Sequence, residues 1–375
     1  MPPGASRTGS VIYLCLEELR PGQAAATHVR AIANGLRKEG WSVSLIAPPE
    51  GSEAARAGLA RRLLRIFPLT FRALRALRGA DIAYVRAHPL AMLFSVVARL
   101  MRKPAVHEVN GRPADLGETY PAFRRALPVI AWLQSMQYRR AAALAAVTPE
   151  LAAWAEQAAR SRAKAHTIPN AADTAVFHPD AAGGPAIDAP FVIFFGGLVA
   201  WHGVDVMLKA LQAPGWPKAV KLVIAGRGDQ SAAVDAEAAR DNRLIATGFI
   251  AQRDLAGLAA RALAVLVPIE HQGGRADTGA APLKLFEGMA SGRPVIVSDL
   301  PFQGALVRET GCGLVVPPSD TAALAAAVAE LASDPARADE MGRAGRAAAE
   351  REHSWQARAK QTSRLLARVL EQDAF

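Results

Sequence analysis

One segment of the chain, Gly273–Pro294, combines residue types that suit a bound anion. A glycine-rich stretch leads into a predicted helix beginning near Pro282, and proline is favoured in a first helical turn. Lys284 falls in that turn, where a cation is unfavourable unless an anion such as a diphosphate binds at the same terminus. Glu287 shares the helix face with Lys284, and its carboxylate could accept both hydroxyls of a ribose. The alternative is an ordinary surface Lys–Glu pair.

Two further glycine turns could bind phosphate. The sequence RPGQAAATH, which contains Gly22 and Gln23, precedes a predicted helix whose first backbone amides would favour an anion. Arg227 follows the glycine that ends the strand LVIAG and could add positive charge. The first turn lacks both the GxGxxG pattern and a Gly-Lys-Ser/Thr sequence, which disfavours nicotinamide, flavin and Walker-type sites. The alternatives are a plain strand–helix turn at Gly22 and a solvated arginine at position 227.

Several kinds of site are excluded by composition. The chain has two cysteines, Cys15 and Cys312, which excludes a disulfide scaffold and a cysteine-based zinc site. It contains no Asp-x-Asp motif, so we expect no metal ion and no other cofactor. The first residues do not resemble a signal peptide, and no window of about 18 residues is apolar and free of charge. We therefore expect a cytoplasmic protein without a transmembrane helix.

The positive charge of the chain is concentrated in its first half. The net charge is +10, and residues 1–185 hold 24 Lys and Arg against 13 Asp and Glu. The densest part is Arg56–Arg78, with seven arginines among large apolar residues. It is predicted to form two basic amphipathic segments divided at Pro68, which suit an anionic membrane surface or an anionic substrate. The alternative is a solvated arginine face. Nucleic acid is disfavoured because the segment has no aromatic platform and no recognised binding motif.

Short apolar runs alternate with helical patterns along the chain. Predicted strands fall at 11–16, 41–47, 81–88, 104–111 and 142–148, and then at 189–197, 219–228, 243–249, 262–268, 294–299 and 311–318. This alternation predicts an α/β fold of two Rossmann-like domains, each a parallel sheet covered by helices. We place the first domain at 1–182 and the second at 183–357. Because ligands bind at the carboxyl ends of parallel strands, we expect the two domains to face a cleft.

Several motifs, taken in order, resemble the retaining glycosyltransferases of family 4, which have the architecture called GT-B. The likeness runs from PGQAAATHVRAIANGLRKEGWSVSLI through HEVNG, VTPEL, IPNAADTAVFHP, FFGGLVAWHGVDVMLKAL and LVIAGRGD to PLKLFEGMASGRPVIVSD and HSW. It implies transfer of a sugar from a nucleotide-diphosphate sugar, with UDP favoured, to a glycan, lipid-linked or small-molecule acceptor. It places the donor on the second domain and the acceptor on the first. It also implies that a last helix, about 358–375, crosses back to the first domain.

The resemblance assigns donor ligands by position. Glu287 matches the second Glu of the family's paired-Glu motif, which is expected on the donor ribose. The first Glu of that pair falls at Gly279, and Asp277 is the candidate to replace it.

The family's Arg and Lys that neutralise the donor diphosphate fall at Gly197 and His202. The WHG sequence at 201–203 is a subgroup variant, as is PLKLFE. His202 could still donate to a phosphate, while Lys284 and Arg227 would supply the missing charge.

The family's common catalytic His falls on Asn110, and Glu108 lies two residues earlier on the same strand face. These two residues would orient the acceptor or the donor sugar. Retention would follow from same-face attack, in which the leaving phosphate oxygen takes the acceptor proton. The catalytic candidates are Glu108, Asn110 and Lys284. The donor-binding candidates are Gly22, Gln23, Gly197, His202, Arg227, Asp277, Leu285 and Glu287.

Two other functions remain as alternatives. A nucleotide-sugar 2-epimerase on the same architecture would isomerise the donor without an acceptor. A non-catalytic partner subunit would bind nucleotide sugar without turnover, in keeping with the changed residues at Gly279, Gly197 and Asn110. The basic first half fits a membrane-bound acceptor in polysaccharide or glycolipid biosynthesis, with the protein peripheral on the inner face of the membrane.

Overall fold

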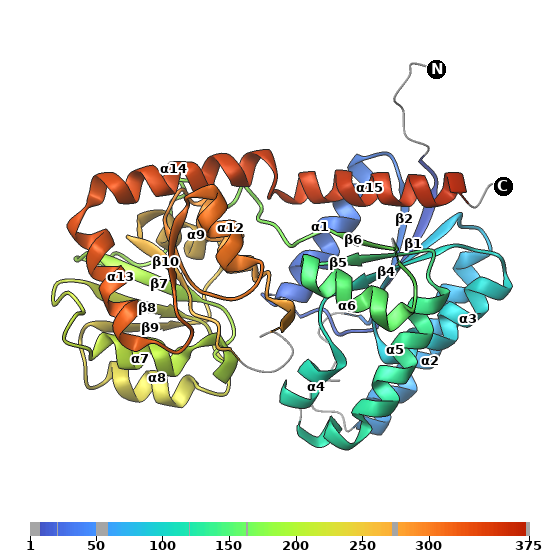
Figure 1. Ribbon diagram of the computed structural model, residues 1–375, viewed down its shortest axis with the longest axis horizontal. Helices are drawn as coiled ribbons and strands as arrows, with labels where there is room; N and C mark the ends of the chain where they lie inside the picture. Colours follow the sequence, from blue (N-terminus) through green and yellow to red (C-terminus); the bar gives the residue numbers. More distant parts are fainter. Residues whose placement is uncertain are drawn as a thin grey trace, which may run out of the picture. The chain divides into compact units, whose positions relative to one another are not determined.

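The computed structural model describes residues 8–20, 22–49, 59–119, 121–162, 164–271 and 277–372. The chain folds as two compact units (Figure 1). Unit 1 comprises Met1–Pro169 and Trp355–Phe375, and unit 2 comprises Asn170–Ser354. Each unit contains a six-stranded parallel sheet with flanking helices, which confirms the predicted α/β class of two Rossmann-like domains.

The sheet of unit 1 has the strand order β2-β1-β3-β4-β5-β6. Its strands are β1 (Ser10–Leu14), β2 (Ser42–Ile46), β3 (Ile82–Arg86), β4 (Ala105–Val109), β5 (Ala143–Ala146) and β6 (Ala165–Thr167). The central strands β3, β4 and β5 are buried at every position, as expected for a parallel sheet covered on both faces. The strand order reverses between β1 and β3, and ligands commonly bind at such a switch point.

Helices cover both faces of this sheet. They are α1 (Ala24–Lys38), α2 (Leu59–Leu77), α3 (Met92–Leu100), α4 (Pro113–Thr119), α5 (Leu127–Arg140), α6 (Pro149–Ala159) and α15 (Trp355–Gln372), with the 3₁₀ segments η2 (Pro89–Ala91) and η3 (Pro121–Ala126). The connection from β1 through α1 to β2 moves across the sheet in one direction, and all the later connections move in the other direction. Right-handed crossovers therefore place α1 on one face and α2, α3, α5 and α6 on the other. α15 packs against α1.

Some helical predictions in unit 1 need correction. α2 is one helix through Pro68 rather than two segments. Pro68 is exposed, so water can satisfy the carbonyl that loses its hydrogen bond. Arg56 lies outside the described residues. The helix α5 begins directly after η3 and has a proline in its first turn. The short helix α4 was not predicted, because its sequence PADLGET has no apolar periodicity.

The sheet of unit 2 has the strand order β12-β11-β10-β7-β8-β9. Its strands are β7 (Phe191–Phe195), β8 (Lys221–Ala225), β9 (Leu244–Gly248), β10 (Ala264–Val267), β11 (Val295–Ser298) and β12 (Gly313–Val316). The order reverses between β7 and β10, so the switch point of this sheet lies at the carboxyl ends of those two strands.

The helices of unit 2 again cover both faces. They are α7 (Val204–Leu211), α8 (Ser231–Ala238), α9 (Gln252–Arg261), α11 (Leu283–Ala290), α12 (Gln303–Thr310), α13 (Thr321–Ser333) and α14 (Pro335–Arg351), with the 3₁₀ segment η4 (Ala200–His202). Right-handed crossovers place α7 and α8 on one face and α9, α11 and α12 on the other. α12 was not predicted, because only eight residues form it and they carry few apolar positions.

The division between the units differs from the predicted boundaries. It falls at 169/170 and 354/355 rather than 182/183 and 357/358. The segment after residue 169 belongs to unit 2 because its side chains pack there. Asn170 Nδ2 donates a 2.7 Å hydrogen bond to Ala281 O, and the Phe177 ring stacks on Phe195 with centroids 6.3 Å apart.

No helix in the part of the chain that the structure describes is both long and apolar enough to cross a bilayer.

Candidate functional site

Lys284 lies at the switch point of the unit 2 sheet, on α11 and beside the end of β7. Its side chain is buried, with 5% exposure, and Nζ lies 3.9 Å from the centroid of the Phe194 ring. Among the described residues, Nζ has no hydrogen-bond partner. Burial lowers the pKa of Lys284 to about 7, although the Glu287 charge opposes that shift. A buried amine without a partner is costly, which indicates a site built to receive an anion.

The turn after β7 passes directly beside this lysine. Gly196 has a φ of +130°, and a Cβ atom on it would lie 3.4 Å from both Cε and Nζ of Lys284. Gly196 and Gly197 are exposed, so open backbone lies next to the buried amine. A Cβ atom on Gly226, after β8, would lie 1.9 Å from Gly196 O, so this second turn also requires glycine. The turn after β8 therefore lies against the turn after β7 that passes Lys284, whereas the predicted turn at Gly22 belongs to unit 1.

Glu287 follows Lys284 on the same helix and is also buried. Burial raises the pKa of Glu287 to about 8, and the Lys284 ammonium opposes the shift. Both groups therefore titrate close to neutral pH. An arriving anion would favour the charged form of Lys284, and the pair could adjust by redistributing a proton.

His202 lies at the end of η4, and its Nδ1 is 2.5 Å from Gly197 O. A carbonyl oxygen only accepts, so Nδ1 carries the proton in this contact. The imidazole also meets the Phe194 ring edge-on, with centroids 6.0 Å apart. Phe194 thus contacts both predicted phosphate ligands, His202 and Lys284. With Nδ1 donating to Gly197 O, His202 can donate to a phosphate only through Nε2. The predicted role therefore requires a ring that carries a proton on both nitrogens.

Arg227 follows β8, and its backbone carbonyl accepts a 3.1 Å hydrogen bond from Leu198 N, which ties it to the β7 turn. Its guanidinium, however, pairs with Asp235, with Nη1 2.7 Å from Oδ2. Both side chains are about half exposed, at 55% and 50%, so a pair of this kind is weak and easily exchanged. Arg227 remains a candidate, although it would have to leave Asp235 to reach a phosphate.

Two other predicted donor residues, Asp277 and Leu285, lie in or before α11, as does Gly279, where the family's first Glu is absent. Asp277 is exposed, and Gly279 has a φ of +69°. A Cβ atom on Gly279 would lie 2.3 Å from Pro301 O, so this backbone has no room for the Glu of the family motif. Leu285 is fully buried, and its N–H already bonds to Pro282 O. Leu285 thus packs in the core of unit 2, and its role as a donor contact stays a prediction.

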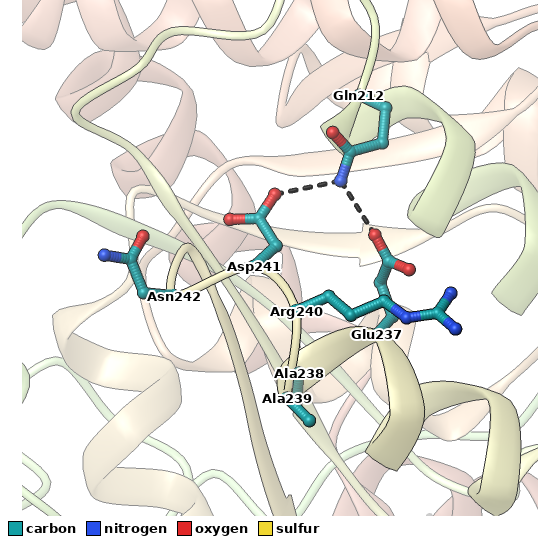
Figure 2. Close-up of a pocket in the computed structure, with 7 residues that line it drawn as sticks. All are labelled: Gln212, Glu237, Ala238, Ala239, Arg240, Asp241 and Asn242. Atoms are coloured by element: carbon teal, nitrogen blue, oxygen red, sulfur yellow. Dashed lines mark hydrogen bonds between the residues drawn. The ribbon is translucent and has the colours of Figure 1, made fainter.

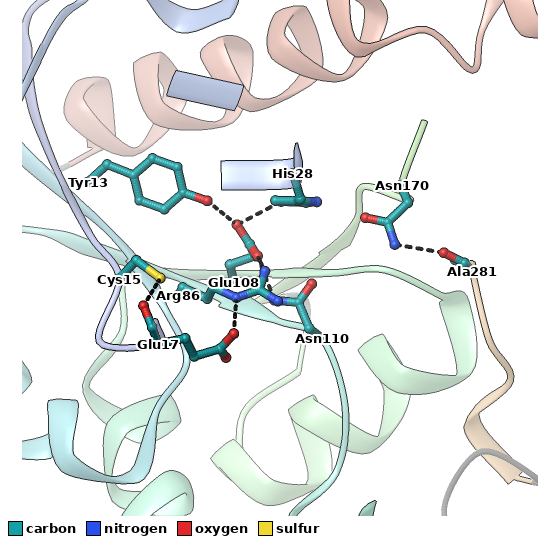
Figure 3. A network of polar contacts seen from close by, with 9 residues as sticks. All are labelled: Tyr13, Cys15, Glu17, His28, Arg86, Glu108, Asn110, Asn170 and Ala281. Atoms are coloured by element: carbon teal, nitrogen blue, oxygen red, sulfur yellow. Dashed lines mark hydrogen bonds and ion pairs between the residues drawn. The ribbon is translucent and has the colours of Figure 1, made fainter. Parts of the chain in front are cut away.

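Glu108 is the centre of a polar network in unit 1 (Figure 3). Its Oε2 accepts from Tyr13 Oη at 2.7 Å and lies 3.0 Å from His28 Nε2. Its Oε1 accepts from Arg86 Nη1 and from Asn110 Nδ2, both at 2.5 Å. The carboxylate is 2% exposed and has two polar partners on each oxygen. The structure therefore brings Glu108 and Asn110 together, as predicted from their spacing along β4.

The electrostatics of this network make Glu108 a fixed anion. Burial alone would raise its pKa, but His28, Arg86 and the Asn110 hydrogen bond hold the pKa of Glu108 well below its usual value. A carboxylate that is buried, fully partnered and ionised is a poor proton acceptor. Glu108 is thus better described as a positioning residue for Asn110 than as a group that touches substrate.

Gly22 and Gln23 precede α1 in unit 1, and both are exposed. Gly22 has a φ of +79°, which explains the glycine at this turn. Gln23 occupies the N-cap of α1, but its side chain makes no capping hydrogen bond. The helix continues to His28, which reaches Glu108, so the turn starts the helix that contacts the network. Gly22 and Gln23 therefore remain candidates through their backbone amides.

Sequence reasoning missed four residues that complete these sites. Tyr13, His28 and Arg86 hold Glu108, and Phe194 lies under Lys284. Arg86 ends a predicted strand, so its position at a carboxyl end was a usable signal. Tyr13 and Phe194 sit inside apolar runs and have no signal of their own.

A surface pocket of about 570 Å³ is lined by none of these residues. It is formed at the amino ends of β8 and β9, opposite to the switch point (Figure 2). There Gln212 Nε2 donates to both Glu237 and Asp241, each at 2.9 Å, so its polar groups satisfy one another. Elsewhere in the described ranges, no three His, Cys, Asp or Glu residues are grouped to hold a metal ion.

Comparison with known proteins shows which families the two halves of the sequence resemble. Residues 25–176 match the family "Glycosyltransferase Family 4", and residues 189–334 match "Glycosyl transferases group 1". Both halves of the chain therefore resemble glycosyltransferase domains. D-rhamnosyltransferase WbpZ of Pseudomonas aeruginosa is 31% identical over 158 residues, which is 41% of this chain and 39% of that protein. The chain matches less than half of the length of the curated relatives that it resembles.

Solved structures share the fold of the two units. Sucrose-phosphate synthase from Thermosynechococcus elongatus has a TM-score of 0.76 at 20% identity, over 98% of this chain and 100% of that one. HepE from Anabaena, in complex with UDP-glucose, has a TM-score of 0.73 at 17% identity, over 96% of this chain and 100% of that one. At such identities the likeness concerns the fold, and it agrees with the GT-B class expected from the sequence.

Proposed function

We propose that this chain is a retaining glycosyltransferase that uses a nucleoside-diphosphate sugar, with UDP as the favoured nucleotide, and needs no divalent metal. The observation that carries the proposal is Lys284, whose buried Nζ has no hydrogen-bond partner among the described residues and lies beside an open glycine turn. A diphosphate would satisfy this amine, and ionised oxygen acceptors make strong hydrogen bonds to it.

The groups around Lys284 fit the parts of such a donor. The first amides of α11 and the exposed turn at Gly196 and Gly197 would supply further donors to phosphate oxygens. Glu287, one turn along, would accept the ribose hydroxyls. The choice of UDP is supported by HepE from Anabaena, whose structure contains UDP-glucose.

The reaction needs the growing charge on the leaving diphosphate to be neutralised. Lys284 would do this as an ammonium, in a buried site where the interaction is strong. The bond between the anomeric carbon and the diphosphate oxygen breaks, and the acceptor oxygen bonds to that carbon on the same face. The leaving oxygen takes the acceptor proton. In unit 1, Asn110 would orient the acceptor, a sugar-containing molecule, and Glu108 would hold Asn110 in place.

The test is transfer followed directly by proton NMR. UDP-sugars, GDP-sugars and ADP-sugars would be offered with simple glycoside acceptors in the presence of EDTA, and the anomeric configuration of the product would be read from its coupling constant. We expect a retained configuration with one nucleotide class. Lys284→Met should abolish transfer, whereas the matched control Lys218→Met, at an exposed lysine of the same unit, should not. Isomerised donor without acceptor would indicate an epimerase, and an inverted product would contradict the mechanism.

A further inference from the structure

The outer side of three neighbouring helices in unit 1 exposes an unusual set of large apolar side chains. α2 packs on α3 and α3 packs on α5, so their outward sides form one surface, here called the α2–α3–α5 face (Figure 1). Its exposed apolar residues are Phe67, Phe71, Leu93, Leu100, Val129 and Trp132. Phe71 is 68% exposed and Trp132 is 57% exposed. Exposed apolar groups in such numbers mark a surface that binds something.

α5 shows that this surface is patterned and not accidental. Its inward side carries the amides of Gln134 and Gln137, which are buried, while Val129 and Trp132 point outward. Gln137 Nε2 donates to the carbonyl oxygens of His88 and Pro89 at 2.8 and 3.0 Å. Tyr138 is buried on α5 as well, so its inward side is mixed, and the two large apolar side chains on its outward side are groups that an external apolar partner would cover.

The charge of the face identifies the partner. The sequences of α2, α3 and α5 contain no Asp or Glu, whereas Arg72, Arg75 and Arg99 are exposed among the apolar residues. A second copy of the chain would bring arginine against arginine, which disfavours a symmetric dimer through this face. Arginines interleaved with phenylalanine, tryptophan and leucine match the interface of an anionic bilayer, which takes both the charge and the rings.

We propose that the α2–α3–α5 face docks unit 1 flat on an anionic lipid membrane. The rings of Phe67, Phe71 and Trp132 would enter the headgroup region, and the arginines would bind lipid phosphates. The proposal extends the sequence-based expectation for Arg56–Arg78 by adding α3 and α5, which that expectation did not include. It concerns where the protein acts and does not depend on the transfer reaction, so donor binding and membrane binding can fail separately.

The experiment is vesicle co-sedimentation of the full chain with phosphatidylcholine alone and with phosphatidylcholine containing phosphatidylglycerol, at low and high salt. We expect binding to the anionic vesicles, weakened by salt. Phe71→Ser with Trp132→Ser, and separately Arg72→Glu with Arg75→Glu, should each weaken binding about tenfold or more. The matched controls Phe249→Ser and Arg253→Glu alter exposed residues of the same types in unit 2 and should bind as the wild type does.

Circular dichroism on the same variants tests whether they fold, and light scattering gives their oligomeric state. All the altered side chains are exposed, so folding should be unchanged. Absence of binding to either vesicle would overturn the proposal in favour of a protein partner. Binding that the unit 1 variants leave unchanged would place the membrane contact elsewhere. A wild-type dimer that becomes monomeric in Phe71→Ser with Trp132→Ser would make this face an interface between copies and would equally overturn it.

Discussion

The Nζ atom of Lys284 lies 3.9 Å from the centroid of the Phe194 ring, in a buried position beside the glycine turn at the end of β7. The ring offers the amine only a cation–π contact, which is weaker than the hydration that burial removes. Lys284 is therefore destabilising for the folded protein without a ligand. Such a residue makes sense where a bound anion restores the lost interactions.

The first prediction is that Lys284→Met stabilises the ligand-free protein. Methionine has a similar length and no charge, so the cost of burying the amine disappears. We expect a gain of roughly 1–3 kcal/mol, or about 2–4 °C in Tm for each kcal/mol. Thermal unfolding at pH 7 measures it, with Lys218→Met as the exposed control. A lower Tm for Lys284→Met than for the control would show that the amine is already well satisfied.

The second prediction concerns the pH dependence of stability through Glu287. Its pKa is raised from 4.5 to about 8 in the folded protein, so the folded state keeps a proton that the unfolded chain releases. This contribution is fully present below pH 4.5 and is lost as the pH rises towards 8. Glu287→Gln cannot titrate, so the variant should gain stability relative to the wild type, on the order of a few kcal/mol, between pH 5 and 8. Parallel Tm-against-pH curves for the two proteins would contradict the raised pKa of this buried carboxyl.

The third prediction is that Glu108→Gln destabilises the protein by roughly 1–3 kcal/mol, because the buried Arg86 then keeps only the part-exposed Glu17 carboxylate as a charged partner. Urea unfolding of unit 1 measures this. Combining Glu108→Leu with Arg86→Met should cost clearly less than the sum of the two single changes. In the Glu108→Gln protein that still folds, the pH profile of kcat should keep its wild-type shape, because Glu108 is already ionised and does not carry the reacting proton. A lost acidic limb would instead identify it as the general base.

The fourth prediction addresses the missing glutamate of the family motif. Gly279→Glu should not improve donor binding, because its Cβ would approach Pro301 O at 2.3 Å in the present backbone. We expect a loss of about 1–3 kcal/mol in stability from strain and clash. Thermal unfolding and donor titration of Gly279→Glu and Gly279→Ala test this together. Tighter donor binding by Gly279→Glu at unchanged Tm would mean that the loop can rearrange.

The sequence predicted the fold well because most strands of both sheets are short, largely apolar runs between turn residues, although the edge strand β6, with the sequence AHT, was missed. Parallel sheets buried on both faces produce that signal directly, as in β3 and β7. The same reasoning missed α12 and α4, because their few apolar residues show no clear helical period. It also divided α2 at Pro68, because the sequence does not show whether a proline ends a helix or lies on its exposed side.

The candidate site was predicted in part. Lys284, Glu287 and the glycine turns were found because strand ends and helix starts can be read along the chain. Arg86 stands at the carboxyl end of a predicted strand, but its pairing with Glu108 could not be predicted, because Tyr13, His28 and Arg86 come from three elements whose register only the folded sheet fixes. Burial of Leu285, and the side-chain environment that moves the pKa of Lys284 to about 7, likewise depend on packing.

The most direct test of the central claim is calorimetric titration of UDP into the wild-type protein and into Lys284→Met, both in EDTA. The Lys284 site should bind UDP in the wild type without metal, and Lys284→Met should weaken binding by about 10–100-fold, the loss of one buried charge-assisted contact. Equal affinity in the two proteins, or binding that appears only when Mg²⁺ replaces EDTA, would contradict a metal-free diphosphate site at Lys284.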